Sequence, residues 1–434
     1  MSLESAEAAE TDPPQHQPLA SLNSRLSNTR RLSSEIAEPL SDEDQVVQAM
    51  DDASPTKWHL GHTTWFFETF VLKQFDEAYA PYDERFAFCF NSYYEAEGER
   101  HPRPKRGLLT RPSNREVRGY RAHVDAALQD FFARKDNDVP AKAAELIELG
   151  IQHEQQHQEL MLTDALSLFS MEPLKPAYRE VDSLPQDGPA PVLEWIDFDG
   201  GIVGVGHSGD GFAYDNERPH HDALLRPFRL ATRCVTNGEW LEFMTDGGYE
   251  TPALWLSDGL AVAREDGWRA PLYWEESAEG WQQMGLHGLQ PVEPAAPVVH
   301  VSFFEADAFA RWAGKRLPSE FEWETAVRGH PEAGNMLGHG ALRPLAAQAN
   351  GASGLKQMYG DVWEWTQSPY SPYPGFKAAA GALGEYNGKF MCNQFVLKGG
   401  SCVTPDGHVR RSYRNFFYPQ QRWQFTGLRL ADDQ

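Results

Sequence analysis

Two histidines on one segment have the spacing of metal ligands. Residues 153–157 read His-Glu-Gln-Gln-His, which fits the pattern H-E-x-x-H. On a helix, His153 and His157 lie on one face about 6 Å apart along the axis, close enough to bind one ion. With Glu154 as general base, the pattern is typical of zinc metalloproteases. The alternative is a pair of hydrogen-bonded histidines in a helical core.

A zinc protease also needs a third ligand, and the segment after His157 offers none in the expected place. It reads QELMLTDAL, without the Gly and His of the metzincin continuation. A ligand Glu would have to come from a second helix after this segment. Repeated prolines prevent a helix there. Glu154 is expected to face solvent as a bystander, because it lies only one residue from His153.

A third ligand is available upstream, in the segment SPTKWHLGHTTWFFETF. Gly61 leaves room beside His62, and His62 lies on the more apolar face of this predicted helix. We therefore predict that His62 is the ligand and that His59 lies behind the ligands or at the surface. Three neutral histidines without a carboxylate leave open positions, which suits Zn(II) with water or Fe(II) with oxygen and substrate.

Four predicted helices must position these histidines. They lie near residues 18–37, 54–75, 115–135 and 139–171. Ser54 is the expected N-cap of the second helix, and Pro140 lies in the first turn of the fourth. Four such helices predict a bundle, and bundles carry metals in their cores on side chains from facing helices.

The rest of the chain has a different pattern of residues. From residue 193, short apolar stretches alternate with Gly, Asn, Asp and Pro, which predicts strands and turns, with one strand at 297–303. Helical pieces at 237–248 and 303–329 interrupt them. The sequence thus predicts an α+β protein of four parts: a disordered tail at 1–17, a helical metal-binding domain at 18–172, a linker at 173–192 and a mixed domain at 193–434.

Composition argues against several classes of partner. A net charge of −24 argues against nucleic acid and anionic membranes, since both need a basic surface. The sequence has no run of about 18 apolar residues and no secretory signal pattern. Its four cysteines form no C-x-x-C pair. We expect a cytoplasmic protein, and a homo-oligomer is compatible with these properties.

Ordered motifs extend over nearly the whole chain from about residue 20. They are WHLGH, HEQQHQE, FAYDNERPHH, VTNGEWLEFMTDGGY, PVVHVSFFEADAFARWAGKRLPSEFEWE, GDVWEWTQSPY, VLKGGSC, RRSYRN and FTGLRL. The N-terminal half resembles DinB-like helical domains. The C-terminal half is similar to the formylglycine-generating-enzyme (sulfatase-modifying-factor) fold, a variant of the C-type lectin architecture. Together they resemble the ergothioneine-biosynthesis sulfoxide synthases, the EgtB family.

The resemblance implies oxygen-dependent carbon–sulfur bond formation. A non-haem Fe(II), held by His62, His153 and His157, would join a cysteine-type thiol to the imidazole of Nα-trimethylhistidine (hercynine), giving a sulfoxide. Matching motifs imply that Gln156 and Asn415 hold the histidine-type substrate.

Further motifs imply roles for aromatic and basic side chains. Phe416, with Phe417 and Tyr418, is a candidate wall for the trimethylammonium group. Arg103 and Arg106 match a pair that binds the carboxylate of the thiol substrate. Either Tyr93 or Tyr94, with a preference for Tyr94, is expected to donate a proton beside the iron.

The thiol substrate is inferred from a departure from the family pattern. Relatives that use γ-glutamylcysteine carry an Asp and then an Arg after the RN of RRSYRN. Here Phe417 stands at the Asp position, and only Arg422 follows. Free cysteine is therefore the expected donor, with γ-glutamylcysteine and an ovothiol-type reaction of unmethylated histidine as alternatives.

Functions of two other classes are also compatible with the sequence. A zinc-dependent DinB-like thiol transferase or hydrolase stays open, as does a lectin-like ligand-binding module. Formylglycine generation is rejected, because it needs two cysteines after GGS and only Cys402 is present. Gly204–Gly209 fits G-x-G-x-x-G, but loop sequence follows instead of a helix, so dinucleotide binding is rejected.

Overall fold

A computed structural model describes most of the chain. The described residues are 19–92, 94, 98–135, 139–181, 183–185, 188–348, 354–379, 384 and 387–434. The tail at 1–17 and Tyr93 therefore lie outside the described residues. Within the described part, no helix is long and apolar enough to cross a bilayer.

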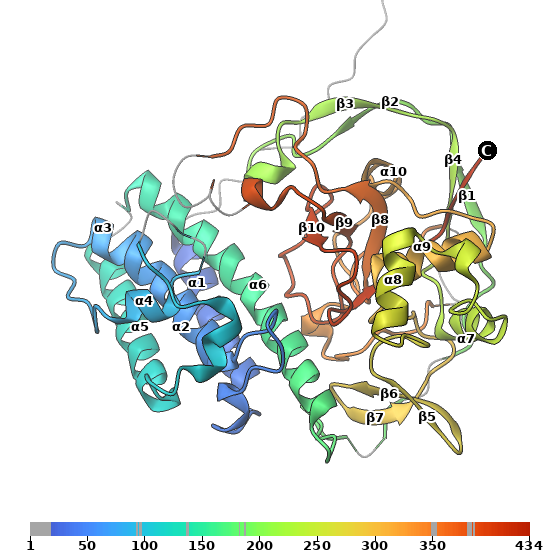
Figure 1. Ribbon diagram of the computed structural model, residues 1–434. Helices are drawn as coiled ribbons and strands as arrows, with labels where there is room; N and C mark the ends of the chain where they lie inside the picture. The colour runs from blue at the N-terminus through green and yellow to red at the C-terminus, as the bar shows by residue number, and fades with distance from the viewer. Residues whose placement is uncertain are drawn as a thin grey trace, which may run out of the picture.

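The N-terminal half is helical, as predicted (Figure 1). Its helices are α1 Leu19–Ala37, α2 Thr56–Phe67, α3 Lys73–Phe75, α4 Phe86–Phe90, α5 Asn114–Lys135 and α6 Ala141–Met171, with a π-turn at Glu68–Leu72 and 3-10 turns at Asp44–Val46 and Arg103–Leu108. Helix α1 packs along α6, and α2 packs against both α5 and α6. The four long predicted segments therefore form a bundle with α2 and α6 as neighbours.

The start of α2 differs from the prediction. Pro55 occupies the N-cap position, and no side chain caps the helix. The hydroxyl of Ser54 instead accepts a hydrogen bond from Arg106 at 2.9 Å. The expected Ser54 cap is therefore wrong, because a residue far along the chain binds that hydroxyl.

Two glycines let α2 and α6 pack closely with their neighbours. A Cβ at Gly61 would lie 2.3 Å from a ring carbon of Phe90, and one at Gly150 would lie 2.4 Å from a ring carbon of Phe67. Any side chain there would push these rings away, since real Cβ contacts are never so short. The space that Gly61 leaves is thus filled by Phe90.

The C-terminal half is mixed and contains small sheets. The strands are β1 Trp195–Phe198, β2 Gly201–Val205, β3 His221–Leu225, β4 Phe228–Ala231, β5 Trp274–Ser277, β6 Gly280–Gly285, β7 Gly288–Pro291, β8 Trp363–Pro369, β9 Phe395–Lys398, β10 Asn415–Phe417, β11 Thr426–Gly427 and β12 Ala431–Asp433. They pair in the orders β1-β4-β12, β2-β3, β5-β6-β7 and β10-β9-β8-β11, and only the β8–β11 pair among these is parallel.

In the described part of this half, four α-helices accompany the strands: α7 Asn237–Thr245, α8 Ser257–Glu265, α9 Phe303–Trp312 and α10 Glu320–Ala326. The predicted strand at 297–303 is wrong, because Pro297 makes one isolated bridge and Ser302 forms a capping box with Glu305 that starts α9. Helix α8 and the β5–β7 sheet were not predicted.

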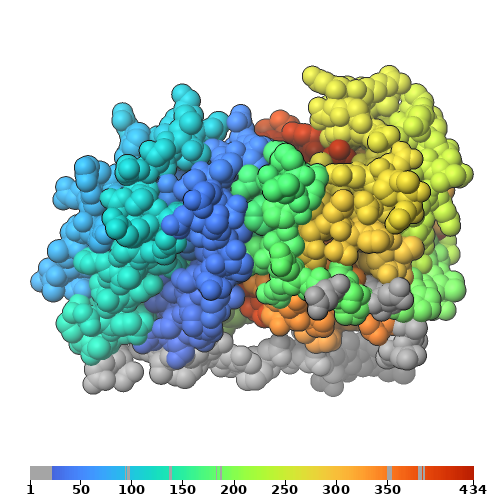
Figure 2. Space-filling model, turned by 90° about the horizontal axis from the view of Figure 1, so that it is seen from below, coloured from blue at the N-terminus to red at the C-terminus, as the bar shows by residue number. Residues whose placement is uncertain are grey.

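Helix α6 lies between the bundle and the C-terminal half (Figures 1 and 2). Its Glu159 carboxylate accepts hydrogen bonds of 2.7 Å from Trp363, Ser401 and Thr404. The segment between α6 and β1 also contacts the bundle, since the buried Tyr178 donates to the carbonyl of Ile36 in α1 at 2.9 Å. One face of α6 therefore carries the histidines while the helix also contacts the second domain.

Candidate active site

Three histidines from two helices converge in the bundle. His62 comes from α2, and His153 and His157 come from α6. The Nε2 atom of His153 lies 3.2 Å from that of His62 and 3.1 Å from that of His157. All three side chains are buried. The structure thus brings together the three predicted ligands.

Burial keeps these imidazoles neutral. Desolvation lowers the pKa of His62 and of His157 well below the ordinary value, with the neighbouring His153 adding to the effect. Desolvation also lowers the pKa of His153, to about 4. Neutral imidazole is the form that binds metal ions.

A hydrogen bond directs one ligand atom inward. His62 donates from Nδ1 to the carbonyl oxygen of Phe90, at 2.6 Å. A carbonyl can only accept, so the proton of the neutral ring is on Nδ1 and the lone pair of Nε2 faces the other histidines. Three converging nitrogen donors without a carboxylate fit Fe(II) or Zn(II).

His59 lies behind the ligands and is not at the surface. Its side chain is buried, with Nδ1 at 2.7 Å from Nδ1 of His157 and Nε2 at 3.0 Å from the Asp164 carboxylate. Of the two positions predicted for His59, the one behind the ligands is correct.

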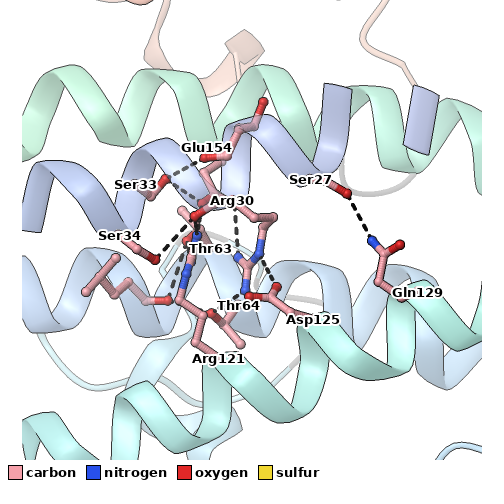
Figure 3. Close-up of polar contacts among 12 residues, drawn as sticks. Ser27, Arg30, Ser33, Ser34, Thr63, Thr64, Arg121, Asp125, Gln129 and Glu154 are labelled. Carbon is pink, nitrogen blue, oxygen red and sulfur yellow. Dashed lines mark hydrogen bonds and ion pairs between the residues drawn. The ribbon is translucent and has the colours of Figure 1, made fainter. Parts of the chain in front are cut away.

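Glu154 does not face solvent, which corrects the prediction. Its buried carboxylate binds Arg30 at 3.0 Å, Arg121 at 2.5 Å and the Ser33 hydroxyl at 2.5 Å (Figure 3). Burial by itself would raise the pKa of Glu154, but the charges of Arg121 and Arg30 outweigh it and hold the pKa at about 2. Because it points to residues of α1 and α5, Glu154 is bound within the bundle and does not act as the base of a protease.

The predicted arginine pair lies on the 3-10 turn Arg103–Leu108. Residues three apart on such a turn share a face. The buried Arg106 guanidinium lies 3.3 Å over the ring of Trp58, and the Trp58 ring stacks on His62 at 4.6 Å. Arg103 is half-buried and donates to the Asp52 carbonyl. Arg106 and the predicted ligand His62 thus both contact the ring of Trp58.

Tyr94 lies in the aromatic packing beside the three histidines. Its buried ring is 5.5 Å from Trp65 and 5.1 Å from Phe70. Trp65 in turn stacks on His62 at 5.7 Å. Tyr93, the other candidate proton donor, lies outside the described residues.

Gln156 reaches the second domain. Its amide nitrogen donates to the hydroxyl of Tyr413 at 2.7 Å. Tyr413 also meets Nε2 of His408 at 3.0 Å, and Nδ1 of His408 lies 3.2 Å from the Oε1 atom of Gln152. The sequence reasoning missed Tyr413 and His408. Tyr413 lies within RRSYRN, but no local pattern indicated its contact with α6.

Two of the residues that follow Tyr413 pack their side chains against Tyr370. Arg414 lies 5.0 Å over the ring of Tyr370, and Phe416 stacks on the same ring at 4.0 Å. Asn415 accepts from the backbone N–H of Phe416 at 3.0 Å. Phe416 therefore lies on the Tyr370 side, and Asn415, the preceding residue of β10, faces the opposite side of the strand.

Arg422 is bound inside the C-terminal half. It donates to the buried Glu305 carboxylate at 2.8 Å and to the Ala270 carbonyl at 3.1 Å. Its guanidinium also lies 4.1 Å over the ring of Trp268. These contacts tie Arg422 to its own domain.

Two family profiles match the N-terminal and C-terminal halves of the chain separately. The DinB superfamily profile matches residues 25–161, and that of the sulfatase-modifying factor enzyme 1-like domain matches 182–337 and 335–434. The hercynine oxygenase of Mycolicibacterium smegmatis is 35% identical over 412 residues, covering 88% of this chain and 91% of its own. The hercynine oxygenase of Mycobacterium tuberculosis is 35% identical over 356 residues, covering 77% and 81%. The formylglycine-generating enzyme of Streptomyces coelicolor is 30% identical over 281 residues, covering 54% and 87%.

Fold and site define a two-domain protein, in which a DinB-like helical bundle with a three-histidine site is joined to a formylglycine-generating-enzyme-like domain. The chain belongs to the hercynine oxygenase (EgtB) family and is an oxidoreductase.

Proposed function

We propose that this enzyme is a non-haem Fe(II) sulfoxide synthase that joins the sulfur of free cysteine to the imidazole of hercynine, with O2 as oxidant. The observation that carries the proposal is the set of three buried, neutral histidines whose Nε2 atoms lie 3.2 and 3.1 Å apart. Relatives 35% and 36% identical to the chain are hercynine oxygenases. When bound, Fe(II) would supply the redox chemistry of the reaction.

The proposed reaction balances with one O2. The S–H bond of the thiol and one C–H bond of the imidazole break, and a C–S bond and an S–O bond form. Dioxygen accepts four electrons, so that one oxygen atom ends in the sulfoxide and the other in water. The hydrogens of the two broken bonds become those of the water, so the protein binds two organic substrates beside the three histidines and only relays protons between them.

The arginine pair supports binding of an amino-acid thiol. Arg106 is buried beside Trp58, where a carboxylate would meet a charge with little competition from water. Its Nη1 and Nη2 atoms donate to the hydroxyls of Ser54 and Ser92, both at 2.9 Å, which hold the guanidinium in place. We assign Arg106 and Arg103 to the carboxylate of cysteine.

Residues on both domains support binding of hercynine. Gln156 lies one residue before the ligand His157, and its amide is held by Tyr413. Asn415 lies on the chain segment that follows this contact. We assign Gln156 and Asn415 to polar contacts with the substrate. Phe416 is the candidate wall for the trimethylammonium group, although its ring stacks on Tyr370.

Tyr94 is our candidate proton donor, with Tyr93 as the alternative. The ring of Tyr94 belongs to the aromatic layer that backs His62 and His153, through Trp65 and Phe66. A phenol held there can donate a proton without adding charge to the site. Sulfoxide formation would then exceed simple oxidation of the thiol.

Two residues, Phe417 and Arg422, favour free cysteine over γ-glutamylcysteine as the thiol donor. Phe417 offers no charge to the γ-glutamyl group. The Arg422 guanidinium is already paired with Glu305, and removing it from this buried carboxylate would be costly. A larger thiol would therefore lack its second set of charged contacts.

The test is a comparison of substrates and metals. Anaerobically purified enzyme, loaded with Fe(II) or Zn(II), is exposed to air with hercynine and either cysteine or γ-glutamylcysteine. Sulfoxide is measured by mass spectrometry and O2 by electrode. We expect sulfoxide only with Fe(II), and faster with cysteine. Preference for the dipeptide would overturn the donor assignment, and activity with histidine alone would favour the ovothiol-type reaction.

Zinc is the metal of the competing class. If the purified enzyme contains zinc and consumes no O2 with hercynine and either thiol, the synthase proposal fails. A DinB-like thiol transferase or hydrolase would then be the better description.

A further inference from the structure

A buried pair of side chains lies directly behind one metal ligand. His59 of α2 lies between His157 and Asp164, both on α6. The separations are 2.7 Å from His157 Nδ1 to His59 Nδ1 and 3.0 Å from His59 Nε2 to Asp164 Oδ2. All three side chains are buried. His157, His59 and Asp164 therefore form a row of contacts that joins α2 and α6, the helices that carry the three histidines.

The direction of each hydrogen bond follows from the acceptor at one end. Asp164 Oδ2 also accepts the backbone N–H of Ser54 at 2.8 Å, so this oxygen acts as an acceptor. His59 must then carry its proton on Nε2. A neutral His59 ring has its only proton there, so its Nδ1 atom, 2.7 Å from Nδ1 of His157, holds a lone pair. That lone pair accepts the proton on Nδ1 of His157.

His157 therefore directs the lone pair of Nε2 toward His153, as a ligand must. His62 reaches the same state by a simpler route, because its Nδ1 donates to the fixed backbone carbonyl of Phe90. His157 has instead a two-residue relay of side chains. The relay can be altered by substitution, whereas a backbone carbonyl cannot.

We infer that Asp164 and His59 are positioning residues that fix the tautomer and ring orientation of His157 and thereby set the affinity of the three-histidine site for its metal. Partners of this kind behind a ligand typically change metal affinity by about 10- to 100-fold when removed. The inference rests on the three-histidine site alone. It holds whether the native ion is iron or zinc and whatever the reaction.

Asp164→Leu is the sharpest variant, because it keeps a side chain of similar size and removes the acceptor. Both hydrogen bonds to Asp164 end on Oδ2, so an Asn could satisfy both through its amide oxygen and would leave the tautomer of His59 unchanged. Without an acceptor, Nε2 of His59 is no longer fixed as a donor, and His59 can carry its proton on Nδ1. The Nδ1 atom of His157 would then accept, and the remaining proton of His157 would move to Nε2, where it blocks metal binding.

The experiment measures metal affinity and tautomer in the full-length chain without substrate or O2. Co(II) is titrated by its visible absorption, and the metal-free chain with ¹⁵N-labelled histidine is studied by NMR. We expect Asp164→Leu to weaken Co(II) binding by about 10- to 100-fold and to convert His157 Nδ1 from a protonated to an unprotonated nitrogen. His59→Phe should weaken Co(II) binding similarly.

Asp125→Leu is the matched control. It makes the same change in the same bundle, where Asp125 pairs with Arg30 and not with a histidine. Its Co(II) affinity should equal that of the parent chain. Parental Co(II) affinity in Asp164→Leu would overturn the inference. The spectrum of the unsubstituted chain gives a second test that needs no variant, since a proton on Nε2 of His157 or on Nδ1 of His59 would also overturn it.

Discussion

The amide nitrogen of Gln156 on α6 donates a 2.7 Å hydrogen bond to the hydroxyl of Tyr413 in the C-terminal domain. Burial raises the pKa of Tyr413, so its phenol keeps its proton and can donate to Nε2 of His408. His408 must then carry its own proton on Nδ1, toward Gln152. This contact between the domains holds the amide nitrogen of Gln156 on the side of the C-terminal domain.

Tyr413→Phe should therefore weaken binding of the imidazole substrate. The variant removes one hydroxyl and keeps the ring. Loss of a hydrogen bond of about 1 kcal/mol predicts a rise of about fivefold in KM for hercynine. The KM for the thiol should change little. Tyr178→Phe is the control, because it removes a similar hydroxyl that donates to the Ile36 carbonyl. Equal effects of both variants on hercynine KM would contradict the role of Tyr413.

Arg106→Lys should weaken binding of the thiol substrate. A lysine keeps the charge but loses the planar fork that lies over Trp58 and reaches Ser54 and Ser92. We expect KM for cysteine to rise by about 10- to 100-fold, which corresponds to a charge-assisted hydrogen bond.

Arg111→Lys provides the comparison for Arg106. Arg111 is exposed, and its guanidinium donates to the neighbouring Thr110 carbonyl. Steady-state rates at saturating hercynine should be unchanged in this variant. If Arg106→Lys also leaves the cysteine KM unchanged, the carboxylate assignment is wrong.

Glu154→Gln should destabilise the helical bundle. It leaves the buried guanidinium groups of Arg30 and Arg121 without their shared carboxylate (Figure 3). Breaking a buried ion pair from one side typically costs about 3–5 kcal/mol of unfolding free energy. Denaturant unfolding of the metal-free chain measures this loss. Glu35→Gln breaks the exposed Arg31–Glu35 pair and should cost less than about 0.5 kcal/mol.

The same ion pairs predict how stability depends on pH. The pKa of Glu154 is lowered to about 2 in the folded chain. In the unfolded chain it would be about 4.3. A lowered pKa stabilises the fold above the unfolded value, and this contribution is lost as pH falls from about 4.3 toward 2. Glu154→Gln should lack this part of the acid transition, and a transition identical to that of the parent would contradict it.

Metal binding should stabilise the chain. A ligand present at 100 times its dissociation constant adds about 2.7 kcal/mol to the unfolding free energy. Anaerobic addition of Fe(II) or Co(II) should therefore raise the melting temperature, and a chelator should reverse the rise. His153→Ala should abolish the shift, while His123→Ala should keep it, because His123 is exposed and bonded to the Ala80 carbonyl. A full shift in His153→Ala would argue against the site.

Local patterns were sufficient for the elements that carry the site. The helix predicted at 139–171 is α6, Ala141–Met171, because Pro140 and a long apolar periodicity both act within a few residues. The spacing of His153 and His157 places them on one face without knowledge of the rest of the chain. The choice of His62 over His59 also agrees with the geometry, since Nε2 of His62 lies 3.2 Å from Nε2 of His153, whereas the ring nitrogens of His59 face Nδ1 of His157 and the Asp164 carboxylate.

The tertiary structure alone decided where the remaining polar groups point. Glu154 is buried because Arg30 and Arg121, each more than thirty residues away, meet it inside the bundle. Tyr413 bonds to Gln156 across 257 positions of sequence. Periodicity reports which face of an element is apolar, but it carries no information on which distant partner satisfies a buried charge or amide. The convergence of His62, His153 and His157 could thus be predicted from the sequence, and the distant partners of Glu154 and Gln156 could not.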